Sequence, residues 1–192
     1  MKNFLSPAIF NFLKNLQKNN NRDWFIANKA EFESAKGEMQ AFFEATLVQL
    51  EREDEFGKSK VYRIYRDARF SQDKTPYKNH MAAIFMRKQP HNRGSFYVHI
   101  EPGNSFIGGG FWNPEKDDLL RIRQGIEMDD ELQVILNDQT LIQKLGGLQG
   151  ESVKTAPKGF SKDHPRIDLL RKKQFILTRP LTDDEVLSSN FI

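Results

Sequence analysis

Segments that favour β-strands gather mainly in the middle of this 192-residue chain, and this placement limits its fold more than any other feature. Amphipathic helical patterns occupy residues 7–52, β-branched and aromatic residues gather in 60–112, and a helical, basic region fills 113–192. A doubly wound sheet needs strands that alternate regularly with helices, and this order lacks that alternation. The sequence therefore predicts an α+β fold, with a mostly antiparallel sheet of about four to six strands packed against several helices.

The N-terminal region is predicted to hold two helices. The first begins at Ser6 and Pro7, because serine caps helices well and proline suits the first turn, and it ends at residues 19–21. The second covers residues 23–51. Gly37 is a candidate break within it, because a glycine in a helix interior costs about 1 kcal/mol.

Four segments of the central region are rich in β-forming residues and are predicted to be strands: 61–65, 81–86, 95–100 and 106–112. The connections at 89–94 and 102–105 contain proline, glycine and asparagine, which favour turns. The strands are therefore expected to follow one another as an antiparallel meander. Three glycines at 108–110 lie in the last strand, where a bulge or a close approach of another backbone is expected.

The C-terminal region is predicted to contain a helix that begins at Pro114, helices at 130–137, 138–145 and 163–171, and a strand at 174–178. Thr182 and Glu185 form a capping-box pattern, which starts one more helix. Because the sequence ends at Ile192, that helix is short, or a native segment follows it. The whole chain, 1–192, is expected to be one domain.

The composition excludes several kinds of site. No cysteine is present, which rules out disulfides, a thiolate nucleophile and cysteine-ligated metals. No stretch approaches the roughly 18 apolar residues of a membrane span, and polar residues interrupt the apolar N-terminus, so we expect a cytoplasmic protein without membrane association. No serine nucleophile elbow, zinc-protease motif, kinase signature or dinucleotide fingerprint occurs, which lowers the odds of familiar enzymes. Whether the protein is an enzyme, and which cofactor it would use, stays open.

Residues 61–78, here called the arginine stretch, hold five basic residues against two aspartates, a net charge of +3. Guanidinium groups suit carboxylate or phosphate, and several cations close together repel one another, so a negative partner is expected among them. That partner is either a ligand or the protein's own aspartates. Aromatic residues separate the cations, and the two sets are Arg63, Arg66, Arg69, Lys74 and Lys78, with Tyr62, Tyr65, Phe70 and Tyr77 between them.

Three functions are consistent with the arginine stretch. In the first, which we favour, a small phosphorylated or carboxylated ligand binds among the cations, and the protein either only binds it or acts on it as an enzyme. In the second, the stretch binds nucleic acid, with bases stacked on the aromatic rings and phosphates held by the cations. In the third, the arginines pair with the protein's own acids, and the chain is a structural or partner-binding module.

The first hypothesis gives roles to particular residues. Asp67 would orient an arginine or act as a base, Tyr77 would contribute its hydroxyl, and Lys158 would extend the site from a second basic loop at 156–160. The ligand-binding residues are then Arg63, Arg66, Arg69, Lys74, Tyr77 and Lys158.

A second group of candidate catalytic residues lies on the predicted strand at 95–100. Side chains alternate across a strand, so His99 and Glu101 share one face while Val98 and Ile100 share the other. A histidine and a carboxylate so placed are candidates for an acid–base pair. A metal site would need a third ligand, and none stands at a recognisable spacing, so no metal is predicted.

The residues from Arg63 to Tyr77 follow the pattern R-x-x-R-D-x-R-F-x-x-D-K-x-x-Y. This pattern resembles the signature R-x-x-R-D-x-R-F-x-x-[DN]-K-x-x-Y of a bacterial family of conserved hypothetical proteins, domain of unknown function 2461. Residues 19–25, 97–103, 108–110 and 156–160 are also similar to the family, so the resemblance extends along nearly the whole chain. It implies kinship and no function, because the family has none assigned.

Overall fold

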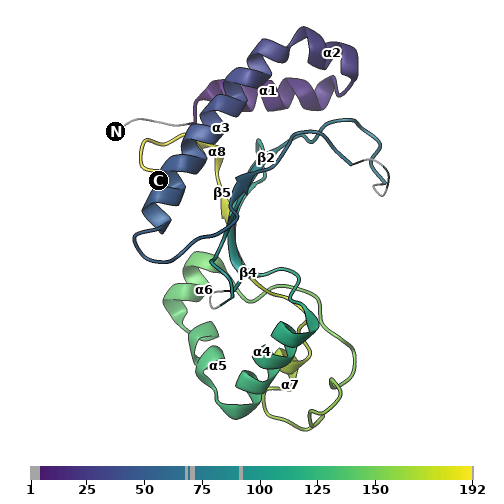
Figure 1. Ribbon diagram of the computed structural model, residues 1–192, viewed down its shortest axis with the longest axis vertical. Coiled ribbons are helices and arrows are strands. Elements are labelled where there is room, and N and C mark those ends of the chain that lie inside the picture. Colours follow the sequence, from purple (N-terminus) through teal and green to yellow (C-terminus); the bar gives the residue numbers. More distant parts are fainter. Residues whose placement is uncertain (1–4, 68, 70–71, 91–92, 192) are drawn as a thin grey trace. The chain divides into compact units, whose positions relative to one another are not determined.

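The computed structural model describes residues 5–67, 69, 72–90 and 93–191 (Figure 1). These residues belong to two compact units, one made of Met1–Ile107 with Pro180–Ile192 and the other of Gly108–Arg179. The single domain expected over 1–192 stays a prediction. Phe70 and the tip of the predicted 89–94 loop, at 91 and 92, lie outside the described residues.

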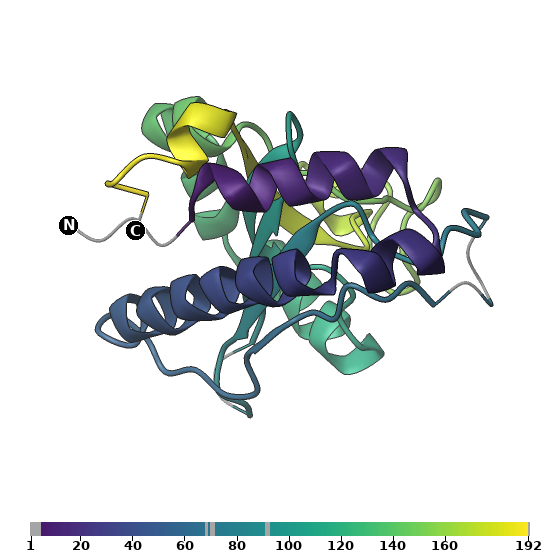
Figure 2. The ribbon, with the colours of Figure 1, turned by 90° about the horizontal axis from the view of Figure 1, so that it is seen from above.

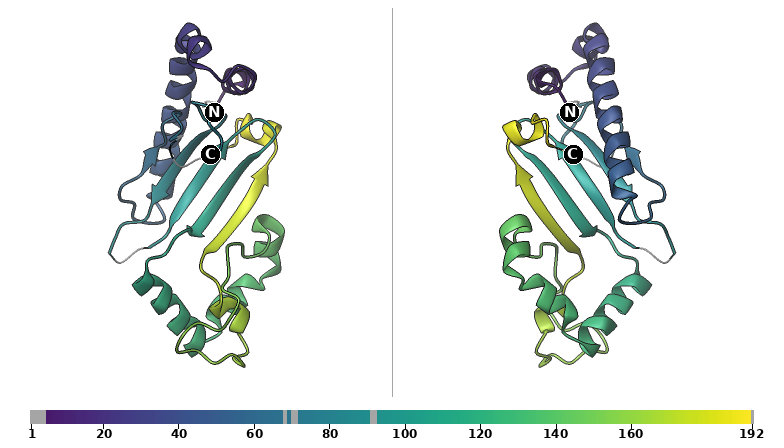
Figure 3. Two further views of the ribbon diagram at one scale, coloured as in Figure 1. Left: turned by 90° about the vertical axis from the view of Figure 1, so that its right-hand side faces the viewer. Right: turned by 90° about the vertical axis from the view of Figure 1, so that its left-hand side faces the viewer.

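Helices come first, strands follow, and helices return before a last strand, as predicted. The helices are α1 (Pro7–Lys18), α2 (Arg22–Ala27), α3 (Lys29–Leu50), α4 (Lys116–Met128), α5 (Glu131–Leu136), α6 (Gln139–Leu145), α7 (Ile167–Leu170) and α8 (Asp183–Val186). The strands are β1 (Lys60–Val61), β2 (Met81–Met86), β3 (Ser95–Ile100), β4 (Ser105–Phe111) and β5 (Phe175–Leu181). They form one five-stranded antiparallel sheet in the order β1-β2-β3-β4-β5, which confirms the α+β prediction (Figure 3).

In the first unit, α1 and α3 lie side by side (Figure 2). Ser6 caps α1 as predicted, since its side chain accepts a hydrogen bond from the amide of Ala8. The apolar faces of α1 and α3 form one core with residues from β2 and β3. Four side chains at the centre of this core are almost fully buried: Phe12, Met39, Phe85 and Ile100.

The predicted break at Gly37 is wrong, because α3 runs through that residue without interruption. The break falls at Asn28, whose backbone amide and side-chain amide both donate to the carbonyl oxygen of Trp24 and so end α2. On either side of Gly37, Ala35 and Met39 are buried in the core. This packing outweighs the roughly 1 kcal/mol that glycine costs in a helix interior.

The strand predicted at 61–65 is wrong over most of its length, since β1 contains only Lys60 and Val61. Beyond β1 the chain turns to another partner: the amide of Lys78 donates to Ile64 and the amide of Arg66 donates to Pro76. The arginine stretch is therefore folded back on itself, with its C-terminal end leading directly into β2.

The second unit has a smaller core made by Ile126, Leu170 and Phe175. Arg123 supports it internally, because its guanidinium donates to the carbonyl oxygens of Leu170 and Lys172. The close approach predicted at the glycines of β4 is confirmed: a Cβ atom at Gly110 would lie 2.0 Å from the carbonyl oxygen of Phe175. Among the described helices, none has both the length and the apolar character needed to cross a membrane.

Candidate functional site

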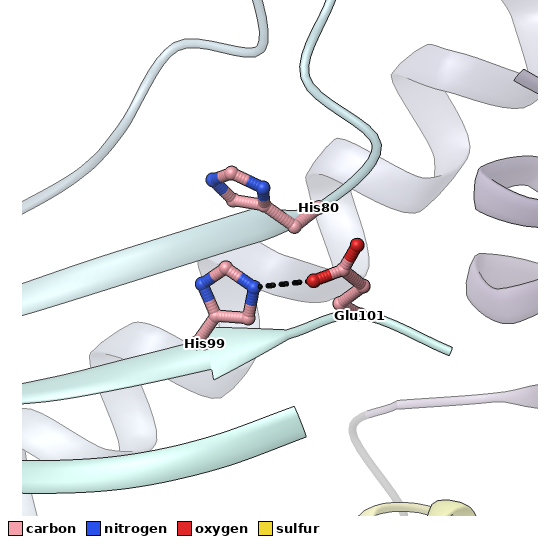
Figure 4. Close-up of side chains that lie close together, drawn as sticks. All are labelled: His80, His99 and Glu101. Atoms are coloured by element: carbon pink, nitrogen blue, oxygen red, sulfur yellow. Dashed lines mark hydrogen bonds and ion pairs between the residues drawn. The ribbon is translucent and has the colours of Figure 1, made fainter. Parts of the chain in front are cut away.

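Three potential metal ligands meet at one end of β2 and β3: His80, His99 and Glu101 (Figure 4). The sheet register explains why. Met81 pairs with Ile100 and Ala82 pairs with His99, so one further step places His80 opposite Glu101. Because alternate residues face the same side of a sheet, all three side chains project from the face opposite the buried Ile100. We call these three residues the histidine centre.

The ligand atoms of the histidine centre lie close together. One nitrogen of each histidine and one oxygen of Glu101 lie within 4.8 Å of one another. The shortest contact joins His99 Nε2 and Glu101 Oε2 at 3.0 Å, drawn as the dashed line in Figure 4. The two imidazole rings lie over each other, with centroids 4.1 Å apart and planes inclined by 33°. A second histidine, His80, therefore lies beside His99 and Glu101, the two residues that the sequence offers as candidates for an acid–base pair.

Two asparagines hold the carboxylate of Glu101 in place. Asn79 Nδ2 donates to Oε1 at 2.6 Å, and Asn104 Nδ2 donates to Oε2 at 2.9 Å. The hydroxyl of Ser105 accepts from the backbone amide of Glu101 and donates to its carbonyl oxygen, which fixes the turn. Burial alone would raise the pKa of Glu101, but its hydrogen bonds with His99 and Asn104 lower the pKa below its ordinary value. Glu101 is thus a fixed, ionised carboxylate at neutral pH.

His99 is enclosed by aromatic rings and is only 8% exposed. Phe106 stacks on it at a centroid distance of 4.7 Å, and the hydroxyl of Tyr97 lies 3.3 Å from Nδ1. Because an ionised carboxylate only accepts, Nε2 of His99 carries a proton toward Glu101. The packing and the two contacts of its nitrogens fix the plane of the His99 ring.

His80 is held in its neutral form. The pKa of His80 is lowered to about 4, mainly by burial and then by the charges of His99, Lys78 and Arg66, while Glu101 acts in the opposite direction. A neutral imidazole has a free lone pair on one ring nitrogen, which is the form that binds metals.

Lys78 brings a positive charge to the histidine centre from the end of the arginine stretch. Burial lowers the pKa of Lys78, and the charges of Arg63 and Arg66 lower it further. Its ammonium group lies 5.4 Å from the ring centroid of Tyr62. Over the described part of the chain, no carboxylate forms an ion pair with Lys78.

Two predicted ligand-binding arginines are paired within the arginine stretch itself. Arg69 donates two hydrogen bonds to the carboxylate of Asp67, from Nε to Oδ1 at 3.0 Å and from Nη2 to Oδ2 at 2.8 Å. Arg66 Nη2 lies 3.0 Å from Asp73 Oδ2 and donates to the carbonyl oxygen of Tyr77 at 3.3 Å. Asp67 is therefore paired with Arg69, and the role predicted for it in a ligand site stays a prediction. These contacts are those expected of an internal salt-bridge network.

The other predicted ligand-binding residues lie in different surroundings. Arg63 and Lys74 are exposed. Tyr77 is buried and stacks on Phe25 at a centroid distance of 3.9 Å, so its ring belongs to the core. Lys158 is exposed on a loop of the second unit, and its part in a shared basic site stays a prediction.

The sequence analysis missed His80 because this residue lies outside the strand that carries the other two. A signal was present in the hairpin. A symmetric β2–β3 hairpin centred between residues 90 and 91 pairs Met86 with Ser95 and, extended in the same register, places His80 opposite Glu101. The third ligand can be predicted only if the register between the two strands is specified, because a shift of one residue would turn His80 to the other face of the sheet.

Comparison with known families identifies the chain's relatives. A family described as "Conserved hypothetical protein (DUF2461)" matches residues 8–192. The chain belongs to this family. The resemblance drawn from the arginine stretch is thereby confirmed at the level of the family. No curated protein and no solved structure gave a significant match, so the DUF2461 membership brings no assigned activity with it.

Proposed function

We propose that this protein binds a divalent first-row transition metal through the histidine centre. One observation carries the proposal: His80 just before β2, His99 in β3 and Glu101 just after β3 place their ligand atoms within 4.8 Å of one another. Two imidazole nitrogens and one carboxylate oxygen form a donor set that suits zinc, cobalt, nickel or iron rather than magnesium or calcium.

The dimensions of the histidine centre fit such an ion. Metal–ligand bonds of about 2.0–2.2 Å in a tetrahedron separate two ligand atoms by roughly 3.4 Å. His99 Nε2 and Glu101 Oε2, at 3.0 Å, are already near that separation. Closing the widest gap, to His80, requires a side-chain movement on the order of 1 Å, which a rotation about χ1 supplies.

The groups around these ligands fit the same role. If Nε2 of His99 binds the ion, its proton moves to Nδ1, where it donates to the hydroxyl oxygen of Tyr97. Asn79 and Asn104 keep the carboxylate of Glu101 oriented. Outer partners of this kind orient the ligands of metal sites and typically change metal affinity roughly 10–100-fold when they are removed.

Three protein ligands leave at least one position of the ion for another molecule. Structural zinc sites use four protein ligands, whereas sites that act on a substrate or bind an exchangeable ligand keep a position open. The proposed function is therefore a metal centre that holds a small molecule, with Lewis-acid chemistry available to it.

Calorimetric titration of the chelator-treated full chain with Zn²⁺, or with Co²⁺ followed by its visible spectrum, tests this proposal. We expect one ion per chain. His80→Ala and His99→Ala should each weaken binding by more than the roughly 10–100-fold that loss of an outer partner costs.

The matched control is His164→Asn, because His164 lies in the other unit, where its Nδ1 accepts a hydrogen bond from the backbone amide of Arg166. This variant should bind metal as the wild type does. Unfolding curves establish that the variants are folded, and His99→Gln is the substitute if His99→Ala is not. Folded His80 and His99 variants that bind metal with wild-type affinity would contradict the proposal.

A further inference from the structure

We propose that this chain associates with a second copy of itself, with α5 of one copy docked on α2 of the other. Each of the two helices places exposed apolar side chains between two exposed charged residues that are seven positions apart. The α5 face consists of Glu131, Val134, Ile135 and Asp138. The α2 face consists of Arg22, Ile26 and Lys29. The proposal does not rest on the metal site, so either can fail without the other.

The α5 face presents two neighbouring apolar side chains to the solvent. Val134 is 61% exposed and Ile135 is 54% exposed. Side chains three, four and seven positions apart lie on one side of a helix, and the amide of Asp138 still donates to the carbonyl oxygen of Ile135. Leu132 lies on another side of α5 and packs against the core of the second unit. Exposed apolar side chains that lie together in this way are typical of a docking surface.

Acids border these apolar side chains. Glu131 and Asp138 lie at the two ends of the α5 face, Asp129 and Asp130 precede it, and the region 113–138 has a net charge of −5. Over the described part of the chain, none of these four carboxylates forms an ion pair with a base. The α5 face therefore favours a partner that is apolar in its middle and basic at its ends.

The α2 face has the same spacing and the opposite charge. Ile26 is 69% exposed, and the exposed Arg22 and Lys29 lie four positions before it and three positions after it. Within the described residues, neither base forms an ion pair with a carboxylate. The arginine stretch, with its net charge of +3, adds positive charge beside α2, because Tyr77 stacks on Phe25 of that helix.

The two faces match in length as well as in charge. Seven positions of helix separate the charged residues of each face, a rise of about 10 Å. Two helices that pack side by side have axes about 8–10 Å apart, which lets side chains at both ends of the contact meet. Val134 and Ile135 of one copy then cover Ile26 of the other. A contact of this size is small for a protein interface, so we expect weak association that depends on salt.

Sedimentation equilibrium of the full chain, with chelator present to exclude association through metal ions, tests the proposal. Self-association should weaken as the salt concentration rises, because the charged pairs are exposed. The double change Val134→Gln with Ile135→Gln should raise the dissociation constant by a factor on the order of 10, as loss of the apolar centre of an interface does. The matched control is Val48→Gln, because Val48 is 56% exposed on α3 and belongs to neither face.

The decisive test is an exchange of charges. Glu131→Lys should weaken self-association, and so should Arg22→Glu and Lys29→Glu when each is made alone. Combined with Glu131→Lys, Lys29→Glu should restore association if the two helices are antiparallel, and Arg22→Glu should restore it if they are parallel. Restoration by a second change of charge separates pairing across the interface from a damaged fold.

Three results would overturn the proposal. The first is a chain that stays monomeric up to about 1 mM, the range in which weak contacts are still detected. The second is self-association that the changes on the α5 face leave unaltered. The third is association that Glu131→Lys weakens and that neither change on the α2 face restores. If the monomeric chain instead binds a synthetic helix of lysine and leucine through the α5 face, the occupant is another protein and not a second copy. Metal binding is measured separately, so none of these results bears on the histidine centre.

Discussion

The arginine stretch and the histidine centre lie next to each other in the chain, and they differ in where the partners of their polar side chains come from. In the arginine stretch, Arg69 and Arg66 are paired with Asp67 and Asp73 from the same exposed segment. In the histidine centre, the polar groups come from two strands and one turn, and His99 is only 8% exposed. The arginine stretch pairs two of its arginines with its own aspartates. The polar side chains of the histidine centre converge at one point instead.

This difference shows where a functional site is favoured. A loop can bend until its cations meet its own acids, so a high local charge often ends as an internal network. Strands fix the side chains by register and leave them little freedom to find other partners. The register holds one ligand atom each of His80, His99 and Glu101 within 4.8 Å of one another, where a single bound ion would be shared by all three.

The largest expected effect on stability concerns Tyr77, which joins the arginine stretch to the core. Tyr77 is 5% exposed and stacks on Phe25, while the side chain of Asn20 donates to its carbonyl oxygen and accepts from its amide. Tyr77→Ala should lower the free energy of unfolding by about 3–5 kcal/mol, as truncation of a buried aromatic does. Denaturant unfolding measures the change.

Tyr77→Phe is the matched control for this prediction. It keeps the ring and removes only the hydroxyl, so it should cost less than about 1 kcal/mol. A loss below about 1 kcal/mol in Tyr77→Ala would mean that the arginine pairs, rather than this ring, hold the stretch in place.

The sequence predicted much of the fold because its strongest signals are local. Ser6 beside Pro7 gave the start of α1, and the glycines at 108–110 gave the close approach to β5. The helix break predicted at Gly37 is wrong, because the low helix propensity of one glycine is outweighed by the packing of Ala35 and Met39 on either side of it.

The candidate site was only half predictable. His99 and Glu101 follow from alternation along one strand, but His80 follows only from the pairing of two strands. The sequence also could not predict which aspartate pairs with which arginine, because the conformation of the loop decides which aspartate each guanidinium reaches. Sequence patterns show which residues share a face of one element, and contacts between elements require the register.

A smaller effect separates the two arginine pairs from each other. The Arg66 side chain is 21% exposed and that of Arg69 is 78% exposed. Exposed ion pairs contribute about 0–1 kcal/mol, and breaking a buried pair costs about 3–5 kcal/mol. Arg66→Ala should therefore lower the free energy of unfolding by about 1–2 kcal/mol, and Arg69→Ala by less than about 0.5 kcal/mol.

Urea unfolding of the two variants measures this difference, with Lys60→Ala as an exposed control. Metal affinity should not change in Arg69→Ala, because its guanidinium binds Asp67 and is not one of the proposed metal ligands. Equal losses in the two variants would mean that exposure does not rank the pairs, and that the stretch acts as one network.

The smallest effect is the pH dependence of the Asp67–Arg69 pair. The hydrogen bonds from Arg69, first that of its side chain and then that of its backbone amide, lower the pKa of Asp67 below its ordinary value. A lowered folded-state pKa means that the pair stabilises the fold above the ordinary pKa of aspartate, and that this stabilisation is lost as the pH falls through the folded pKa. Carbonyl-detected NMR should show Asp67 titrating below the ordinary value in the wild type and closer to it in Arg69→Ala. Because the pair is exposed, added salt should reduce the shift in the wild type. An Asp67 that titrates identically in both proteins would show that the two side chains are not joined in solution, and the arginine stretch would then have a guanidinium available to an external anion after all.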